Sequence, residues 1–199
     1  MYNPANLDIG IDDTVVDIGA NIGVFTLFAA CKTQNHVHSF EPFPKNFEFL
    51  NRNIGINNLH NVRIHAAAVC DKVGTQKLFV NDSNTSHFLS SLNTKERFEK
   101  SIEVPTTTLE DIMDSNNLKQ IDFLKLDCEG AEGAILQSTT EGYLKRVRKI
   151  AMEFHDNTSP LKHDEIEKLL IESGFKTKLD WNGRKPYGYL YGFRTSDSA

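Results

Sequence analysis

One segment near the start of the sequence constrains the fold more than any other. Residues 15–23 read Val-Val-Asp-Ile-Gly-Ala-Asn-Ile-Gly. The apolar start of this run is typical of a parallel strand covered on both faces. Gly19 permits a tight turn and a close approach of the backbone to a ligand, and Gly23 lets the next helix pack close to the sheet. We therefore expect a strand, a glycine-rich turn and a helix whose N-terminal N–H groups are free to bind a polar or anionic group.

Strand and helix patterns alternate along the rest of the chain. Strands are expected at 14–18, 36–41, 62–69, 75–80, 102–107, 121–128, 149–155, 175–181 and 187–194. Helices are expected at 21–32, 44–53, 109–115 and 159–173, with a further helix that ends at about residue 138. This alternation predicts an α/β fold with a doubly wound, mostly parallel sheet. The last two strands flank Asn182-Gly183, a hairpin signal, so an antiparallel pair is expected at one edge. Residues 81–100 show no clear pattern.

Composition limits the class of protein. A chain of 199 residues predicts a single domain over residues 1–199. The net charge of −5 argues against nucleic-acid binding. No apolar run approaches the ~20 residues of a membrane span, and no basic-then-apolar signal pattern opens the sequence. The three cysteines form no paired motif, which suits a reducing compartment. We therefore expect a cytoplasmic protein, and the sequence leaves its oligomeric state open.

An acidic residue after the second strand favours an adenosine-containing cofactor. Glu41 lies about twenty residues past the glycine turn, the spacing at which a carboxylate reaches the two hydroxyls of a ribose. Such a carboxylate would repel a 2′-phosphate, which disfavours NADP. Asn21 can adopt left-handed backbone geometry within the turn. Asp17 is expected either to accept a hydrogen bond from the ligand or the turn, or to cap the following helix.

A second group of polar residues ends two later strands. Asp127 ends one, and Glu153 and His155 end the next, where the alternation of a strand places both on one face. Ligands of open α/β sheets bind beyond the carboxyl ends of the strands. Glu129 and Glu132 follow Asp127, three residues apart, and are expected to share a helix face or to favour a helix N-terminus. His155 has the simpler alternative of capping the next helix.

Four segments together resemble the FkbM-type S-adenosylmethionine (SAM)-dependent methyltransferases. They are residues 17–23, Phe40-Glu41-Pro42, residues 121–132 and Glu153-Phe154-His155, and the similarity spans about residues 14–175. The resemblance implies a class I, Rossmann-like, seven-stranded sheet with helices on both faces and an antiparallel C-terminal hairpin. It also implies methyl transfer to a hydroxyl of a sugar or small natural product. The residues then expected to bind SAM are Asp17, Gly19, Ala20, Asn21, Gly23, Glu41 and Pro42.

The hydroxyl of the acceptor must lose a proton during such a transfer. Asp127 or His155 is the expected base, and the imidazole has the better unperturbed pKa for that role. In an alternative, Asp127, Glu153 and His155 bind Mg²⁺ or another divalent ion that lowers the pKa of the hydroxyl. Two other functions also remain open: an NAD-dependent oxidoreductase, which would use the same glycine turn and Glu41, and a non-catalytic SAM-binding module.

Overall fold

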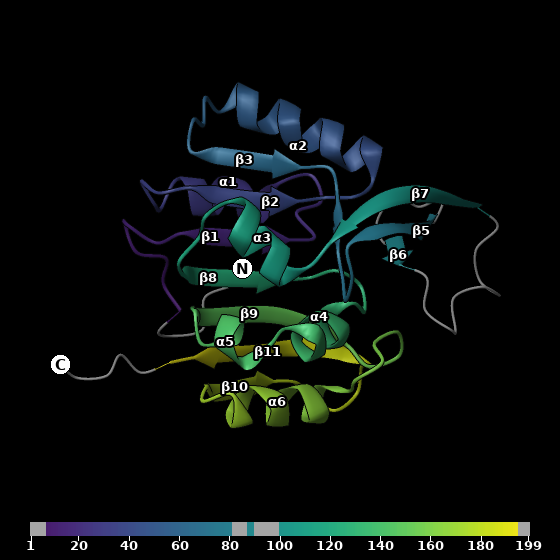
Figure 1. Cartoon of the computed structure of the whole chain (residues 1–199). Coiled ribbons are helices and arrows are strands. Elements are labelled where there is room, and N and C mark those ends of the chain that lie inside the picture. The colour runs from purple at the N-terminus through teal and green to yellow at the C-terminus, as the bar shows by residue number, and fades with distance from the viewer. Residues whose placement is uncertain (1–6, 81–86, 90–99, 195–199) are drawn as a thin grey trace.

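A seven-stranded sheet forms the centre of the protein (Figure 1). The computed structural model describes residues 7–80, 87–89 and 100–194. The strands lie in the order β10-β11-β9-β8-β1-β2-β3. Their bounds are β1 Val15–Ile18, β2 Val37–Phe40, β3 Val62–His65, β8 Ile121–Leu126, β9 Val147–His155, β10 Lys176–Asp180 and β11 Tyr187–Phe193. Only β11 pairs antiparallel with its neighbours, β9 and β10, which confirms the mostly parallel sheet with an antiparallel C-terminal hairpin.

Helices cover both faces of this sheet, as expected for a Rossmann-like fold. Their bounds are α1 Val24–Ala30, α2 Pro44–Ile56, α3 Leu109–Ser115, α4 Glu132–Ser138, α5 Glu141–Leu144 and α6 His163–Glu172. Successive residues of β1 point to opposite faces. Val16 is buried in a core with residues of α3, α4 and α6, whereas Val15 is buried with residues of α1. Burial on both faces explains the continuous apolar run of this strand.

A second, four-stranded sheet lies beyond the carboxyl ends of the parallel strands, at the right of Figure 1. Its strands lie in the order β4-β7-β5-β6, with bounds β4 Ala68–Val69, β5 Gly74–Val80, β6 His87–Leu89 and β7 Lys100–Thr107. The prediction of one strand over residues 62–69 is therefore wrong. The chain leaves the first sheet after His65, and β4 pairs in parallel with β7. Ala66 and Ala67 separate the two strands, and alanine has a low preference for strands.

The first helix begins three residues later than the sequence predicts, at Val24. Gly19, Asn21 and Gly23 have φ values of 77°, 52° and 95°. These positive values are incompatible with a right-handed helix, so the whole of residues 19–23 belongs to the turn. The last helix likewise begins at His163 rather than four residues earlier.

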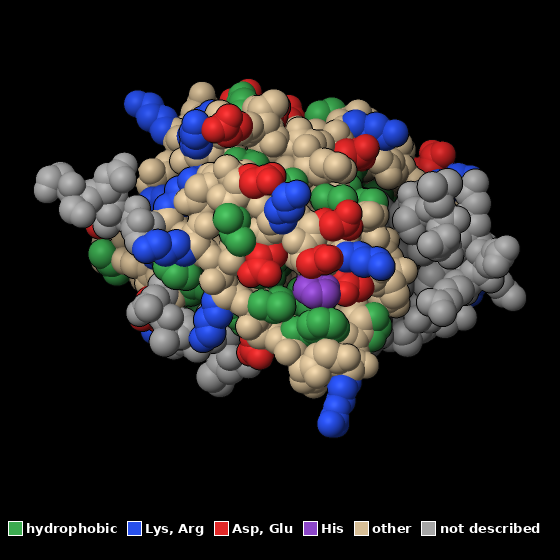
Figure 2. Space-filling model, turned by 90° about the horizontal axis from the view of Figure 1, so that it is seen from below, with side chains coloured by type: hydrophobic (Ala, Val, Ile, Leu, Met, Phe, Trp, Pro, Cys, Tyr) green, Lys and Arg blue, Asp and Glu red, His purple; other side chains and the backbone are tan. Residues whose placement is uncertain are grey.

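The surface carries charges of both signs. The face in Figure 2 shows Lys and Arg side chains interspersed with Asp and Glu, and no continuous basic area. Within the described ranges, no helix is both long and apolar enough to cross a bilayer. The expectation that the protein binds no nucleic acid stays a prediction.

Candidate active site

A pocket of about 220 Å³ opens where β1, β2 and β8 end against the second sheet. Five of the predicted site residues line it: Gly19, Asn21, Glu41, Pro42 and Asp127. Four others lie outside its wall: Asp17, Ala20, Gly23 and His155. The second sheet contributes Ala68, Val69 and Leu78. The sequence did not predict this wall, because it placed residues 62–69 in one strand of the main sheet.

The two glycines of the turn allow close packing that no larger residue would permit. A Cβ atom on Gly19 would lie 1.8 Å from the carbonyl oxygen of Asp127. A Cβ atom on Gly23 would lie 2.6 Å from a methyl carbon of Leu50 in α2. Both residues also have positive φ values, a conformation that glycine adopts without strain. Gly19 therefore lets the turn lie directly against the end of β8, which the sequence did not predict, and Gly23 packs against α2 rather than against the sheet.

The backbone N–H groups of residues 19–23 all have partners within the chain. Gly19 and Ala20 donate to the carbonyl of Phe40, and Asn21 donates to the carboxylate of Glu41. Ile22 donates to the side chain of Asn21, and Gly23 donates to the carbonyl of Ala20. The N–H groups of the turn itself are therefore not free to bind a ligand, although the sequence predicted that its glycines bring free N–H groups to the start of the helix. The turn folds back on the end of β2, and its donors hold it there.

Glu41 joins the turn to the start of α2. Its two carboxylate oxygens accept hydrogen bonds from the N–H groups of Asn21 and Phe43, each at 2.8 Å. Burial raises the pKa of Glu41, although these two hydrogen bonds oppose the rise. Each oxygen keeps a lone pair for a further donor. The carboxylate lies on the pocket wall, where it can accept hydrogen bonds from the hydroxyls of a ribose.

Asp17 lies beneath the turn, fully buried, and its partners are side chains of the protein. The Thr26 hydroxyl donates to it at 2.7 Å, and the Lys125 ammonium lies 3.2 Å away. Lys125 also donates to the carbonyl of Gly19 at 2.7 Å and lies 3.5 Å from Asp127. Burial lowers the pKa of Lys125, but the two carboxylates outweigh this and raise it, so the ammonium keeps its charge.

The role of Lys125 was not predicted from the sequence. The signal was a lysine within the apolar strand Phe-Leu-Lys-Leu, because a charge inside a strand buried on both faces needs a partner there. Its partner Asp17 is 108 positions away in sequence. Only the pairing of β1 with β8, which places Asp17 opposite Lys125, shows the pair.

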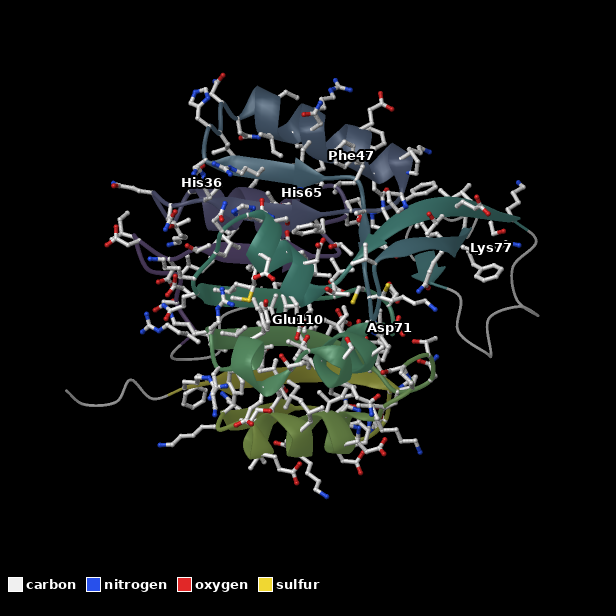
Figure 3. All side chains as sticks on the ribbon, in the orientation of Figure 1. His36, Phe47, His65, Asp71, Lys77 and Glu110 are labelled. Carbon is white, nitrogen blue, oxygen red and sulfur yellow. The ribbon has the colours of Figure 1, made fainter. Side chains whose placement is uncertain are left out.

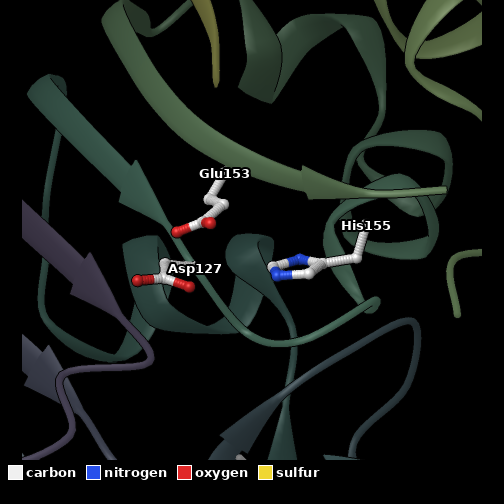
Figure 4. A group of neighbouring side chains, drawn as sticks. All are labelled: Asp127, Glu153 and His155. Atoms are coloured by element: carbon white, nitrogen blue, oxygen red, sulfur yellow. The ribbon is translucent and has the colours of Figure 1, made fainter. Parts of the chain in front are cut away.

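Asp127, Glu153 and His155 come together at the ends of β8 and β9. Figure 4 shows the three side chains pointing towards a common space. One ligand atom from each lies within 4.8 Å of the other two. Asp127 and Glu153 also line the pocket, so this group borders the predicted cofactor site.

His155 is held between two carboxylates. Its Nδ1 atom lies 3.2 Å from Glu132, and its Nε2 atom lies 3.4 Å from Glu129. Burial would lower the pKa of His155, but the hydrogen bond and charge of Glu132, with the charges of Glu129 and Asp127, raise it to about 9. The pKa of His155 is therefore above the ordinary histidine value, and that ordinary value was the reason for preferring His155 to Asp127 as the base.

Glu132 organises the turn between β8 and α4. It is fully buried, and it accepts hydrogen bonds from the N–H groups of Cys128 and Gly130 at 2.9 and 3.0 Å. Glu129 has a φ of 57° and precedes the helix, so the expectation that Glu129 and Glu132 share a helix face is wrong. The turn instead directs both carboxylates towards His155.

The part of the sequence that forms this site matches a known family. The family model described as Methyltransferase FkbM domain covers residues 17–177. The chain belongs to the FkbM methyltransferase family. It is therefore a methyltransferase, and the seven-stranded sheet is the fold of that enzyme class.

Three curated relatives of this FkbM-family methyltransferase are informative. Methyltransferase sdnD of Sordaria araneosa is 29% identical, over 90% of this chain and 79% of its own length. The 31-O-demethyl-FK506 methyltransferase FkbM of Streptomyces tacrolimicus is 28% identical, over 82% and 72%. The hexuronic acid methyltransferase AglP of Haloferax volcanii is 26% identical, over 84% and 65%.

Two solved structures have the same fold as this FkbM-family methyltransferase. A methyltransferase FkbM from Methylobacillus flagellatus aligns with a TM-score of 0.65 at 16% identity, over 94% of this chain and 45% of its own. The Streptococcus mutans protein SMU.1697c, in complex with S-adenosylhomocysteine (SAH), aligns with a TM-score of 0.58 at 9% identity, over 94% of this chain and 91% of its own.

Proposed function

We propose that this methyltransferase uses SAM to methylate a hydroxyl oxygen of a sugar or other small natural product. One observation carries the proposal: the glycine turn, Glu41 and Asp127 line a single pocket at the carboxyl ends of the parallel strands. Open α/β sheets bind their ligands at such an edge. The family membership supplies the methyl-transfer chemistry.

We assign the two ends of SAM to different residues of the pocket wall. Glu41 would accept hydrogen bonds from the ribose hydroxyls, with Pro42 beside it. Gly19 and Asn21 would contact the methionine part. Asp17 would act from beneath the turn, and Ala20 and Gly23 from within it, since their contacts fix its shape. These roles make the turn a rigid support rather than a set of free donors.

Asp127 would lie at the reactive end of the cofactor. It lines the pocket, and its side chain is 31% exposed, so an acceptor can reach it. His155 lies behind it, with both ring nitrogens facing Glu129 and Glu132. The protein aligns the acceptor oxygen, methyl carbon and sulfur. Asp127 then promotes loss of the hydroxyl proton, either by accepting it or by binding a cation that lowers the hydroxyl pKa.

The names of the relatives support an acceptor of this class. One relative acts on a demethylated FK506 and another on a hexuronic acid. The acidic groups that line the pocket suit the positive sulfonium of SAM, and Glu41 suits its ribose. The family match does not support an NAD-dependent oxidoreductase. A non-catalytic SAM-binding role would give no function to the group formed by Asp127, Glu153 and His155. We also propose that residues 1–199 form a single domain and that the protein is cytoplasmic.

A transfer assay tests the proposal. The purified protein is incubated with methyl-labelled SAM and a panel of methyl glycosides, a methyl uronoside and small secondary alcohols, and label in the acceptor is measured. We expect transfer to at least one acceptor, and a loss of about 10²- to 10⁴-fold in Asp127→Asn. Glu110→Gln, in α3 (labelled in Figure 3), is the matched control and should keep full activity. Label transfer that is unchanged in Asp127→Asn would contradict the proposed role of this residue.

A further inference from the structure

We propose that Asp127, Glu153 and His155 bind one divalent cation of the Mg²⁺ or Mn²⁺ type, and that this cation holds the acceptor hydroxyl. The inference rests on the proposed methyl transfer and deepens it. It names the route by which the hydroxyl becomes reactive. The three residues lie at the ends of adjacent strands, where the sheet fixes their positions.

The distances suit a metal ion. The three ligand atoms lie within 4.8 Å of one another. In an octahedral site with bonds of roughly 2.1 Å, ligand atoms lie about 3 to 4 Å apart, so a small contraction would bring these three into place. The side chains converge on one space in Figure 4. Two carboxylates and one imidazole form a donor set suited to divalent cations of this kind.

His155 is oriented as a metal ligand would be. Metal-binding histidines commonly donate their second ring N–H to a carboxylate, which fixes the tautomer and the ring. Glu132 plays this part at Nδ1, and it is itself fully buried and held by the N–H groups of Cys128 and Gly130. Nε2 is thereby turned towards the carboxylates, with Glu129 at 3.4 Å. A ring nitrogen of His155, rather than a ring carbon, therefore faces Asp127 and Glu153 (Figure 4).

The charge around the site favours a cation. Three carboxylates line this end of the pocket: Asp127, Glu129 and Glu153. Among the described residues, Lys125 is the ammonium that lies close to Asp127, and its shorter contacts go to Asp17 and the carbonyl of Gly19. A divalent ion would balance the remaining negative charge. It would also lower the pKa of a bound hydroxyl and hold its oxygen beside the cofactor.

Direct cation binding tests the inference without relying on activity. Protein freed of metal by chelation is titrated with Mn²⁺ and followed by electron paramagnetic resonance. We expect one saturable site per chain, and Asp127→Asn and Glu153→Gln each to weaken Mn²⁺ binding by about tenfold or more. Control variants are Glu110→Gln and His163→Gln, the latter from the separate His163–Asp156 pair, and both should bind Mn²⁺ normally.

The outcomes separate the cation from the methyl transfer. SAH binding, measured on the same samples, reports whether each variant is folded and whether the cofactor pocket is intact. Absence of saturable Mn²⁺ binding, or equal binding in wild type and both carboxylate variants, would overturn the cation site. Full methyl transfer in excess chelator would also overturn it while leaving the proposed function standing. Saturable Mn²⁺ binding by a protein that binds no SAH would support the cation site and contradict the proposed use of SAM.

Discussion

The ammonium group of Lys125 lies 3.2 Å from the carboxylate of Asp17, and both side chains are almost completely buried. The same ammonium donates to the carbonyl oxygen of Gly19. One side chain of β8 therefore holds the end of β1 and the start of the glycine turn. An ion pair in this position ties the shape of the cofactor pocket to the pairing of two central strands.

Lys125→Met should destabilise the protein strongly. The change leaves Asp17 as a buried charge without its partner, and breaking a buried pair in this way typically costs about 3–5 kcal/mol. The double variant Asp17→Asn/Lys125→Met should recover part of this loss, because no charge is then left unpaired. Urea unfolding measures both. Lys145→Met removes the exposed Lys145–Glu141 pair and should leave the unfolding midpoint nearly unchanged. Equal midpoints for wild type and Lys125→Met would show that the pair contributes nothing.

Gly19→Ala should be far more damaging than Gly183→Ala. Both glycines have similar φ values, 77° and 71°. The new methyl group at Gly19 would lie 1.8 Å from the Asp127 carbonyl, whereas at Gly183 nothing lies within 4 Å. Backbone strain alone costs roughly 1–2 kcal/mol and applies to both. Thermal unfolding should therefore show the larger loss for Gly19→Ala. Equal losses would mean that β8 can move away from the turn without cost.

Glu41→Gln should weaken cofactor binding by about tenfold or more, the equivalent of about 1.4 kcal/mol. The amide replaces one carboxylate oxygen, so a hydrogen bond to Asn21 or Phe43 is lost together with an acceptor for the ribose. Isothermal titration with SAH measures the change. Glu48→Gln, on the exposed side of α2, is the matched control. Unchanged affinity in Glu41→Gln would remove Glu41 from the cofactor site.

His38 should make the stability of the protein depend on pH. Burial, with the charges of His65 and Arg63, lowers the pKa of His38 from 6.5 to about 4. The ring is buried, stacks on His65 (labelled in Figure 3), and neither of its nitrogens has a hydrogen-bond partner among the described residues. Between these pH values the unfolded chain binds a proton that the folded chain does not. Stability should therefore be full above pH 6.5 and fall as the pH drops towards 4.

His38→Phe checks this pH dependence. The phenyl ring keeps the stacking and cannot be protonated, so urea unfolding across this pH range should show a shallower slope. His65, whose pKa is also lowered by burial, should account for part of the remaining slope. His60→Gln, at an exposed position, should behave as wild type does. An unchanged slope in His38→Phe would assign the acid sensitivity to other groups.

The sequence predicted the main sheet well because its strands carry their own signals. The apolar run before Gly19 marks a strand buried on both faces, and Asn182-Gly183 marks the hairpin. Each signal comes from residues that are neighbours in the sequence, so it can be recognised without knowledge of the fold. The positions of Glu41 and Asp127 at the pocket followed from the rule that parallel strands end at a common edge.

Features that depend on distant pairing were missed. The second sheet needs β4 to leave the first sheet and pair with β7, and the alternation within residues 62–69 does not report which sheet a strand joins. The raised pKa of His155 depends on Glu129 and Glu132, whose direction is set by a left-handed turn rather than by helix spacing. The partner of Lys125 is likewise on another strand.

A crystal structure of the protein soaked with SAH shows whether the pocket at the ends of β1, β2 and β8 is the cofactor site. We expect density for one SAH in this pocket, with its ribose hydroxyls at Glu41 and its sulfur beside Asp127. Density at another surface, or a pocket that stays closed by the side chains of Asp127 and Glu153 at saturating SAH, would contradict it.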